Sequence, residues 1–490
     1  MANIADVYRI RKTDFPAAVK APADAQPNAD TSYPNLMTLL PKTTRRTFIK
    51  AAGISTTLLS VTPNVLRAMS PRPIRKGKLI AADKKMKIAC IGCGGKGFSD
   101  ITSVGTEDVV ALCDVDFSQA EKICAKYPDV PKFKDFREML QKMDSEIDGV
   151  TISTPDHVHY VAGKLAIGMG KHVFIQKPLT HSIWEARDLL AAARRHGVIT
   201  QMGNQGHAGE GIRLVREWVQ ADLIGPVREV HVWTSKTELG RYKSTLKARP
   251  QPGEQPPPSL DWNLWVGPAP MRPYSEEYHP RRWRNWWDFG CGALGDIGCH
   301  TMDAAFYALD LGAPAYVQAE TAPYNEETYP DWSIITYEFA QRGAMPPVRL
   351  VWYDGGKTPP RPPGLEPNRT FDLRYGYYMV GDKGVIYDQS EKCSSPRLVP
   401  ETRMRETLFP ERSIPRVPGG DPLKEWIAGC KGGPLPGSNF EYAVPLTEMV
   451  LLGNIAIRAR GKRIRWQAAG MKIPNARELE EYLGTERRTS

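Results

Sequence analysis

The feature that most constrains the fold is a glycine-rich turn directly after a short apolar run. Residues 87–91 read Lys-Ile-Ala-Cys-Ile and predict a buried strand, and Gly92, Gly94 and Gly97 follow with the spacing Gly-x-Gly-x-x-Gly. The first glycine permits a tight turn, the second lets the backbone approach a pyrophosphate, and the third lets the next helix pack closely on the strand. The turn therefore predicts a dinucleotide bound at the N-terminus of that helix.

A second apolar run supports this interpretation. Residues 109–113 predict another buried strand, which ends at Asp114, 22 residues after Gly92. A carboxylate at that position would accept hydrogen bonds from the adenosine ribose hydroxyls and would repel a 2′-phosphate. We therefore expect NAD as the cofactor, with NADP disfavoured.

Strands and helices continue to alternate up to about residue 205. We expect strands at 149–153, 172–176 and 198–202, and helices at 118–127, 136–142, 159–169 and 183–196. This alternation is typical of a parallel sheet with right-handed crossovers. The sequence thus predicts an α/β Rossmann-type domain over residues 81–205.

Polar residues gather where these strands end, at the edge where such sheets bind ligands. They are Thr154, Pro155, His159, Gln176, Lys177, Asn204 and His207, and we expect them to contact the cofactor or the substrate. Lys177 is well placed to polarise an oxygen on the carbon that loses hydride. His157 and His159 lack an evident third ligand, so we expect no metal site.

After residue 206 the alternation breaks. Strands expected at 227–234, 316–320, 333–339, 348–353, 377–380 and 385–388 follow one another mostly without helices between them. This pattern predicts an α+β domain over residues 206–490 with a large, mostly antiparallel open sheet. A helix at 446–459 has apolar residues at helical spacing and is expected to close the core.

A glycine-rich stretch at residues 290–298 opens a helix that carries Asp296 and His300. The two residues are four positions apart, so they share one helix face. An imidazole beside a carboxylate can take a proton from a hydroxyl near neutral pH. Together with a nicotinamide and Lys177, this pair supplies the parts that hydride transfer from an alcohol requires. On its own, an Asp and His at this spacing is more often a surface pair.

Seven Trp and Tyr residues lie between Trp262 and Trp287. They could simply pack in a core, but with the nearby Arg281, Arg282 and Arg284 they also suit the faces and hydroxyls of a sugar, Trp283 and Trp287 among them. We expect these two tryptophans at the substrate.

The basic charge of the chain belongs to its first eighty residues. Residues 1–80 contain 13 Lys or Arg and 4 Asp or Glu, whereas the remaining 410 residues contain 52 and 51. The folded part is almost neutral, so the net charge of +10 does not indicate a nucleic-acid binder. We predict that residues 1–80 are a leader and linker.

Arg45 and Arg46 precede a modest apolar run from Ala51 to Val65. This run is too short and too polar to span a bilayer stably, and it resembles a twin-arginine export signal. The alternative is a basic amphipathic surface helix. We expect export by the twin-arginine machinery to the periplasm or another extracytoplasmic space, with cleavage near Ala68. Translation from either Met1 or Met37 is consistent with the sequence.

Taken together, these motifs resemble the Gfo/Idh/MocA oxidoreductases over about residues 85–465. The resemblance rests on the glycine turn, Thr154-Pro155 with His159, Lys177-Pro178, and the pair Asp296 and His300. It implies NAD(P)-linked oxidation of a sugar or cyclitol hydroxyl, Lys177 as the active-site lysine, and a second sheet that commonly forms oligomer contacts, so we expect a homo-oligomer. One position departs from the family pattern, because Gln176 replaces the glutamate of Glu-Lys-Pro.

The hypothesis is therefore an exported, NAD-dependent dehydrogenase that acts on a carbohydrate, with His300 as base, Asp296 as its helper and Lys177 beside the forming carbonyl. A tightly bound, recycled cofactor would suit export. Two alternatives remain open. One is NAD-dependent glycoside cleavage by transient oxidation and elimination, and the other is a non-catalytic sugar-binding relative, which the loss of the glutamate at position 176 motivates.

Overall fold

The computed structural model describes residues 74–235 and 248–484, so the predicted export signal lies outside the described residues. The first sheet has six parallel strands in the order β3-β2-β1-β4-β5-β6. Their bounds are β1 Lys87–Ile91, β2 Asp108–Cys113, β3 Lys132–Phe133, β4 Gly149–Ile152, β5 His172–Gln176 and β6 Thr200–Gly203. The direction of the strand order reverses between β1 and β4, as in a dinucleotide-binding sheet.

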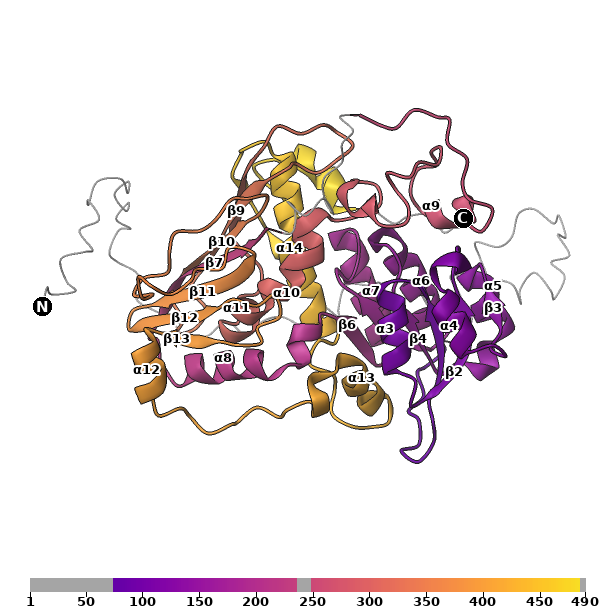
Figure 1. Cartoon of the computed structure of the whole chain (residues 1–490), viewed down its shortest axis with the longest axis horizontal. Coiled ribbons are helices and arrows are strands. Elements are labelled where there is room, and N and C mark those ends of the chain that lie inside the picture. Colours follow the sequence, from indigo (N-terminus) through magenta and orange to yellow (C-terminus); the bar gives the residue numbers. More distant parts are fainter. Residues whose placement is uncertain (1–73, 236–247, 485–490) are drawn as a thin grey trace, which may run out of the picture. The chain divides into compact units, whose positions relative to one another are not determined.

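Helices cover both faces of this sheet (Figure 1). Side chains alternate along β1: Ile88 and Cys90 pack on one face, whereas Ala89 and Ile91 pack on the other. The first face is covered by α3 Lys96–Ser103, α4 Glu121–Lys126 and α13 Pro422–Cys430, and the second by α5 Phe136–Lys142, α6 Asp156–Gly168 and α7 Ile183–His196. Because both faces are buried, the central strands β1, β4 and β5 consist mainly of buried apolar residues.

The second sheet has eight strands in the order β13-β12-β11-β7-β10-β9-β8-β14. All its pairs are antiparallel except β7 with β10. The bounds are β7 Val227–Thr234, β8 Tyr316–Thr321, β9 Ser333–Phe339, β10 Val348–Tyr353, β11 Tyr375–Gly381, β12 Gly384–Asp388, β13 Arg397–Val399 and β14 Ile464–Arg465. The predicted fold class, a parallel Rossmann sheet followed by a mostly antiparallel sheet, is confirmed.

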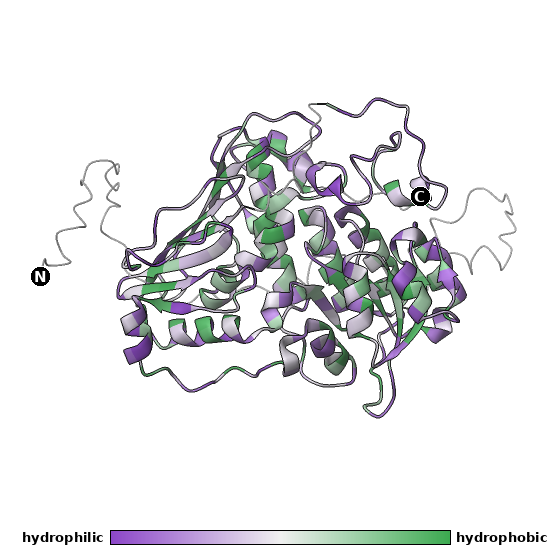
Figure 2. Cartoon of the chain, viewed as in Figure 1, coloured by the Kyte–Doolittle hydropathy of each residue, from purple (hydrophilic) through white to green (hydrophobic). Residues whose placement is uncertain are grey.

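One face of the second sheet packs on helices α8 Glu210–Gln220, α11 Asp303–Ala308 and α14 Phe440–Arg458. The other face carries Trp233, Tyr378 and Tyr387, which pack against Leu365 and Phe371 of the segment between β10 and β11. Figure 2 shows hydrophobic residues concentrated on the strands and on the helices that meet them.

Helix α14 links the two sheets, because it packs against α7 and β6 as well as against β8 and β9. Among the described residues it is the one helix long and apolar enough to cross a membrane, with a mean hydropathy of 1.3. It is mostly buried inside the protein, as core helices of this composition are.

Most predicted elements fall within a few residues of the observed ones, and 136–142, 172–176, 183–196, 227–234, 333–339 and 348–353 have the predicted bounds. Two differences concern the site. Helix α6 begins at Asp156 rather than at His159, and residues Leu294–Gly298 form a π-helical turn rather than an α-helix. The helices α12 Glu401–Glu406 and α13 and the strands β13 and β14 were not expected.

Candidate active site

A cleft of about 940 Å³ lies at the carboxyl ends of the first sheet's strands. Three further segments complete its wall: residues 264–284, the turn that bears Asp296 and His300, and residues 391–392 between β12 and β13. Of the predicted site residues, Gly92, Gly94, Asp114, Thr154, Pro155, Gln176, Lys177, Trp283, Asp296 and His300 line the cleft. The structure therefore brings the predicted cofactor and catalytic groups together.

The glycine turn has the form that a dinucleotide requires. Gly92 has φ +83°, and a Cβ atom there would lie 2.6 Å from the carbonyl oxygen of Ser153. A Cβ atom at Gly97 would collide with the carbonyl oxygen of Gly92, so α3 can approach β1 only with glycine at that position. A Cβ atom at Gly95, the first residue before α3, would meet nothing within 4 Å. The backbone is thus open toward the cleft where a pyrophosphate would bind.

Asp114 supports this turn from the end of β2. Its Oδ2 accepts hydrogen bonds from the backbone N–H groups of Cys93 at 2.7 Å and Gly94 at 3.3 Å, and its Oδ1 accepts one from Asp116 at 3.0 Å. A carboxylate offers about four acceptor positions, which leaves one for a ribose hydroxyl. Asp114 therefore both fixes the glycine turn and fits the role predicted for it. These residues suit the adenosine and pyrophosphate parts of NAD.

Lys177 and Asp296 form a buried ion pair in the cleft. The ammonium group of Lys177 donates to the Asp296 carboxylate and, at 2.8 Å, to its backbone carbonyl oxygen. The other carboxylate oxygen lies 3.4 Å from Nε of Arg284. The carboxylate expected to assist His300 therefore contacts two cations, and its clearest effect is to hold the Lys177 ammonium group in place.

His300 lies on α10 Cys299–Thr301, directly after the π-helical turn, and its ring lines the cleft. It is only 4% exposed, so packing shields most of its side chain from solvent. The π-helical turn depends on Gly295, because a Cβ atom there would collide with Cβ of Cys291. Asp296 and His300 both face the cleft, as the spacing predicted.

Sequence reasoning missed a further carboxyl group, that of Asp156. It lies in the first turn of α6, lines the cleft, and accepts a hydrogen bond from the backbone N–H of Cys291 at 3.0 Å. Burial raises its pKa to about 7, against the opposing effect of Arg284 and Lys177. Its place directly after Thr154-Pro155 at a strand end was the available signal.

Three predicted site residues lie behind the cleft wall. His159 is fully buried, and its ring nitrogens face the carbonyl oxygens of Pro178 at 2.8 Å and Thr154 at 3.0 Å, so it braces two strand ends. Burial lowers its pKa to about 4. Asn204 and His207 are also buried, and both contact the carboxylate of Asp303. These three side chains support the site rather than line it.

The aromatic segment, residues 260–290, forms its own hydrophobic cluster against the first sheet. His157 of α6 anchors it, because its ring nitrogens contact the carbonyl oxygens of Phe289 at 3.1 Å and Trp265 at 3.0 Å. Trp283 lines the cleft, with the guanidinium of Arg284 4.2 Å from its ring centroid. Trp287 instead packs against Tyr329. Only the first of the two predicted tryptophans lines the cleft.

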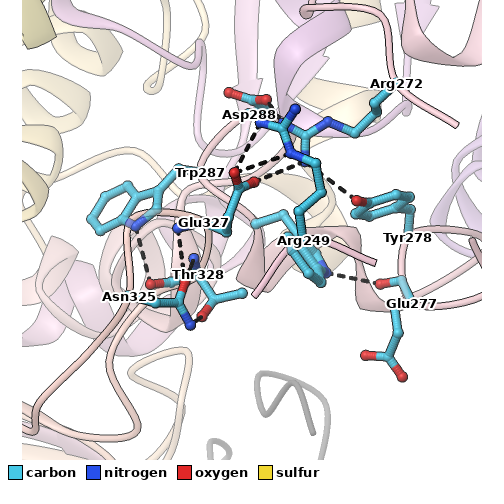
Figure 3. Close-up of polar contacts among 10 residues, drawn as sticks. Arg249, Arg272, Glu277, Tyr278, Trp287, Asp288, Asn325, Glu327 and Thr328 are labelled. Carbon is cyan, nitrogen blue, oxygen red and sulfur yellow. Dashed lines mark hydrogen bonds and ion pairs between the residues drawn. The ribbon is translucent and has the colours of Figure 1, made fainter. Parts of the chain in front are cut away.

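A buried arginine links the aromatic segment to the loop between β8 and β9 of the second sheet (Figure 3). Arg272 contacts the carboxylates of Asp288 and Glu327, and Arg249 donates to the same Glu327 at 2.8 Å. The Arg272 side chain is 2% exposed, so this pairing is largely shielded from solvent. The pairing holds the aromatic segment, other residues of which line the cleft, against the second sheet's loop.

The aromatic segment also closes against the adenosine side of the cleft. His279 Nε2 lies 3.0 Å from the carboxylate of Asp116, and both side chains are buried. The backbone N–H of Asp261 donates to the carbonyl oxygen of Val115, and Lys134 donates to that of Ser259. Burial alone would raise the pKa of Asp116, but hydrogen bonds from Ser118 and His279 lower it. These contacts clamp the segment over the strand that ends at Asp114.

Comparison with known families agrees with this geometry. Residues 86–204 match the family model for the NAD-binding Rossmann fold of the Gfo/Idh/MocA oxidoreductases, and residues 209–345 match the model for the family's C-terminal alpha/beta domain. The chain belongs to the Gfo/Idh/MocA oxidoreductase family. Its first sheet therefore belongs to the NAD-binding domain of that family, and the match to the C-terminal domain covers strands β7, β8 and β9 of the second sheet.

Among individual Gfo/Idh/MocA relatives, the chain is 25% identical over 214 residues to the D-glucoside 3-dehydrogenase of Escherichia coli (strain K12), 44% of this chain and 50% of that protein. It is 27% identical over 194 residues to a glycosyl hydrolase family 109 protein of Streptomyces coelicolor, 35% of this chain and 41% of that protein. The matches thus span about half, or less, of the length of these curated relatives.

Solved structures share the fold. The WlbA dehydrogenase from Bordetella pertussis, in complex with NADH and UDP-GlcNAcA, aligns with a TM-score of 0.55 at 17% identity, covering 78% of this chain and 99% of that one. An inositol dehydrogenase homolog from Azotobacter vinelandii, complexed with NADH and myo-inositol, aligns with a TM-score of 0.51 at 12% identity, covering 80% and 99%.

Proposed function

We propose that this protein is a NAD-dependent dehydrogenase that oxidises a hydroxyl group of a sugar, glycoside or cyclitol. One observation carries the proposal: Lys177, Asp296 and His300 line the same cleft as the glycine turn and Asp114. These residues come from both halves of the chain. Their convergence supplies a cation, a base and a dinucleotide site around one space.

Bound NAD would supply a hydride acceptor. The work of this chain's own residues is to manage the proton and the charge of the substrate hydroxyl. His300 is suited to take the hydroxyl proton as general base, since it lines the cleft and an imidazole titrates near neutral pH. Lys177 is suited to stabilise the negative charge that develops on the same oxygen. Asp296 holds Lys177 in position through two contacts.

The substrate class is inferred from the wall and from the relatives. Trp283 offers an aromatic face, and Arg281 and Arg284 offer hydrogen-bond donors suited to hydroxyl groups. The names of the relatives mention a D-glucoside, myo-inositol and a nucleotide sugar. All three are polyhydroxylated rings, so a ring of this kind is the expected substrate.

Export and cofactor retention form a further part of the proposal. Arg45 and Arg46 support export by the twin-arginine machinery to an extracytoplasmic space, where free NAD is scarce. A cofactor that stays bound and is recycled by a second substrate would meet that condition. The contact of His279 with Asp116 supports retention, because it closes the aromatic segment over the adenosine side.

Purification of the exported protein without added nucleotide tests this proposal. Native mass spectrometry is expected to detect one NAD per chain, and a panel of glucosides, free sugars and inositols is expected to include one that reduces it. Absorbance and fluorescence of the reduced nicotinamide would report the reaction. A purified protein that neither holds nor binds NAD would overturn the proposal. Sugar binding without reduction would favour a non-catalytic relative.

A second candidate function is glycoside cleavage by transient oxidation, elimination of the aglycone, addition of water to the resulting double bond and return of the hydride. Asp156 favours it, because elimination adds the transfer of a proton from carbon to the aglycone oxygen, and this carboxyl lines the cleft with a pKa raised to about 7. An aryl glucoside distinguishes the two reactions. Aglycone release without accumulation of reduced nucleotide would support cleavage, whereas accumulation of reduced nucleotide with an intact glycoside would support net oxidation.

A further inference from the structure

The carboxylate of Asp100 is buried beneath the cleft and has no role in the function described above. It lies on α3, the helix that follows the glycine turn, and is 1% exposed. Three donors meet it: the ammonium group of Lys96 at 2.5 Å, the hydroxyl of Ser153 at 2.7 Å and the amide Nε2 of Gln176 at 2.8 Å. Asp100 itself does not line the cleft, but all three donors do.

Gln176 is held in one orientation by these contacts. Because a carboxylate only accepts hydrogen bonds, the amide nitrogen of Gln176 must face Asp100. Its Oε1 then faces the other way and accepts from Nε2 of Gln205 at 3.3 Å. Gly203 makes room for this arrangement, since a Cβ atom there would lie 2.6 Å from the Gln176 amide nitrogen. The side chain next to Lys177 is thereby fixed.

A glutamate could not occupy position 176 in the same way. Its carboxylate would lie within hydrogen-bond distance of the Asp100 carboxylate, in a place with little access to water. Two like charges so close cannot both ionise, so one of them would hold a proton. The departure from the family's Glu-Lys-Pro at Gln176 therefore matches the presence of Asp100.

We propose that Asp100 is a positioning residue for the NAD site, and that Asp100 and Gln176 form a matched acceptor–donor pair. The single carboxylate ties together α3, the end of β4 at Ser153 and the end of β5 at Gln176, three of the segments that form the cofactor side of the cleft. This inference rests on the proposed NAD site and deepens it. In this chain the carboxylate beside the Gln176 position is supplied by Asp100, whereas the family's Glu-Lys-Pro would supply one at position 176 itself.

The charged and titratable groups that face Asp100 are few. The ammonium group of Lys96 is the close cation, and the thiol of Cys90 on β1 lies near enough for its own pKa to be affected. Burial raises the pKa of Asp100, and Lys96, Ser153 and Gln176 oppose that rise. A carboxylate at position 176 would repel the carboxylate of Asp100 and so raise the pKa of this pair further. The pair would therefore take up a proton as the pH falls.

The test compares Gln176→Glu, Asp100→Asn and the double variant in the full-length protein freed of nucleotide. NAD⁺ affinity is measured by tryptophan fluorescence and calorimetry, and the melting temperature is measured without ligand. We expect Gln176→Glu to weaken NAD⁺ binding about tenfold or more at about pH 8 and to regain most of it at about pH 5.5, where a protonated glutamate can donate to Asp100. Each variant is compared with the wild type at the same pH, because Asp156 in the same cleft has a pKa of about 7 and titrates in every one of these proteins.

Asp100→Asn with Gln176→Glu should recover NAD⁺ affinity to within about threefold of the wild type at both pH values, because the amide now donates to the carboxylate. Asp100→Asn alone should have a small effect, since the amide of Gln176 can rotate. Gln119→Glu is the matched control: it adds the same charge to the cleft wall at an exposed site, so its effect should not change between the two pH values.

An equal loss of NAD⁺ affinity at both pH values for Gln176→Glu relative to the wild type, or a double variant no better than Gln176→Glu, would overturn the inference. The ligand-free melting temperatures give a second, independent result. A double variant more stable than Gln176→Glu at about pH 8 supports the matched pair even if no sugar is oxidised. Absence of NAD⁺ binding in the wild type would instead count against the proposed function.

Discussion

The ammonium group of Lys177 contacts both the carboxylate and the backbone carbonyl oxygen of Asp296. The Lys177 and Asp296 side chains are 11% and 9% exposed. Lys177 follows a strand of the first sheet, whereas Asp296 belongs to the domain that contains the second sheet. A lysine held against two oxygens keeps a fixed position with little loss of side-chain entropy during reaction. The pair therefore places a preorganised cation at the cleft.

Lys177→Met should abolish that cation while leaving most of the side-chain volume. We expect kcat to fall about 10²–10³-fold, which is the usual effect of removing one preorganised group that stabilises developing charge. NAD⁺ affinity should change little, since the glycine turn and Asp114 remain. Steady-state kinetics and nucleotide titration measure the two effects separately.

Lys164→Met is the matched control for this variant. Lys164 also pairs with an aspartate, Asp188, but it is not part of the cleft lining. Its loss should leave kcat within about twofold of the wild type, as expected for a surface ion pair. Similar losses of kcat in the two lysine variants would argue against a specific role for Lys177.

His300→Ala should remove the group proposed as general base. We expect kcat to fall about 10²–10⁴-fold, and we expect added imidazole to restore part of it because the cavity left behind opens into the cleft. His196→Ala, at the end of α7 and outside the cleft lining, should behave like the wild type. Activity in His300→Ala that is both high and insensitive to imidazole would show that another group takes the proton.

Asp156 gives a prediction about stability and pH. Burial raises its pKa from 3.8 to about 7, so between these values the folded state holds a proton that the unfolded chain releases. Stability contributed by this group is therefore complete below about pH 4 and is lost as the pH rises through about 7. Asp156→Asn keeps an acceptor for the N–H of Cys291 but cannot ionise.

The melting temperature of Asp156→Asn minus that of the wild type should consequently increase from about pH 5 to about pH 8. Asp108→Asn is a suitable control, since Asp108 is half exposed at the start of β2. The difference in melting temperature between this variant and the wild type should stay nearly constant across the same pH range. A constant difference for Asp156→Asn as well would contradict the raised pKa. Differential scanning fluorimetry across a buffer series is sufficient.

The sequence predicted the parts of the site that follow from local chemistry. The glycine turn and Asp114 belong to one strand–turn–helix unit and its neighbour, so spacing alone located them. Lys177 and His300 were found because each follows a recognisable strand end or glycine-rich turn. Such signals depend on a few adjacent residues, which one sequence contains.

Contacts between distant segments could not be predicted in this way. Asp100 meets Gln176 and Ser153 only after three strands are aligned, and His279 reaches Asp116 across 163 residues. His159 and His207 come a few residues after strand ends, where ligands often bind, yet both are buried and neither lines the cleft. The position of a residue after a strand predicts which edge of the sheet it lies near. Whether its side chain faces the cleft depends on the side chains that pack around it.

The contact between His279 and Asp116 leads to a prediction about cofactor release. His279→Ala should loosen the aromatic segment over the adenosine side, so that bound NAD dissociates at least about tenfold faster, the effect expected from losing a buried, charge-assisted hydrogen bond. Stopped-flow displacement with excess NADH measures the rate. Arg282→Ala, which removes an exposed arginine paired with Glu277 on the same segment, should leave it unchanged.

Two glycines provide the last prediction, because they contrast backbone crowding with open space. Gly97 lies where α3 meets β1, and a Cβ atom there would collide with the carbonyl oxygen of Gly92, which belongs to backbone and cannot move aside without opening the glycine turn. Gly168 ends α6, and a Cβ atom there would meet nothing within 4 Å.

Gly97→Ala should therefore lower the melting temperature and weaken NAD⁺ binding by tenfold or more, an estimate of about 1.4 kcal/mol. Gly168→Ala should instead stabilise the fold by about 0.5–1 kcal/mol through reduced chain entropy and leave NAD⁺ binding intact. Equal behaviour of the two variants would mean that α3 does not need its close approach to β1.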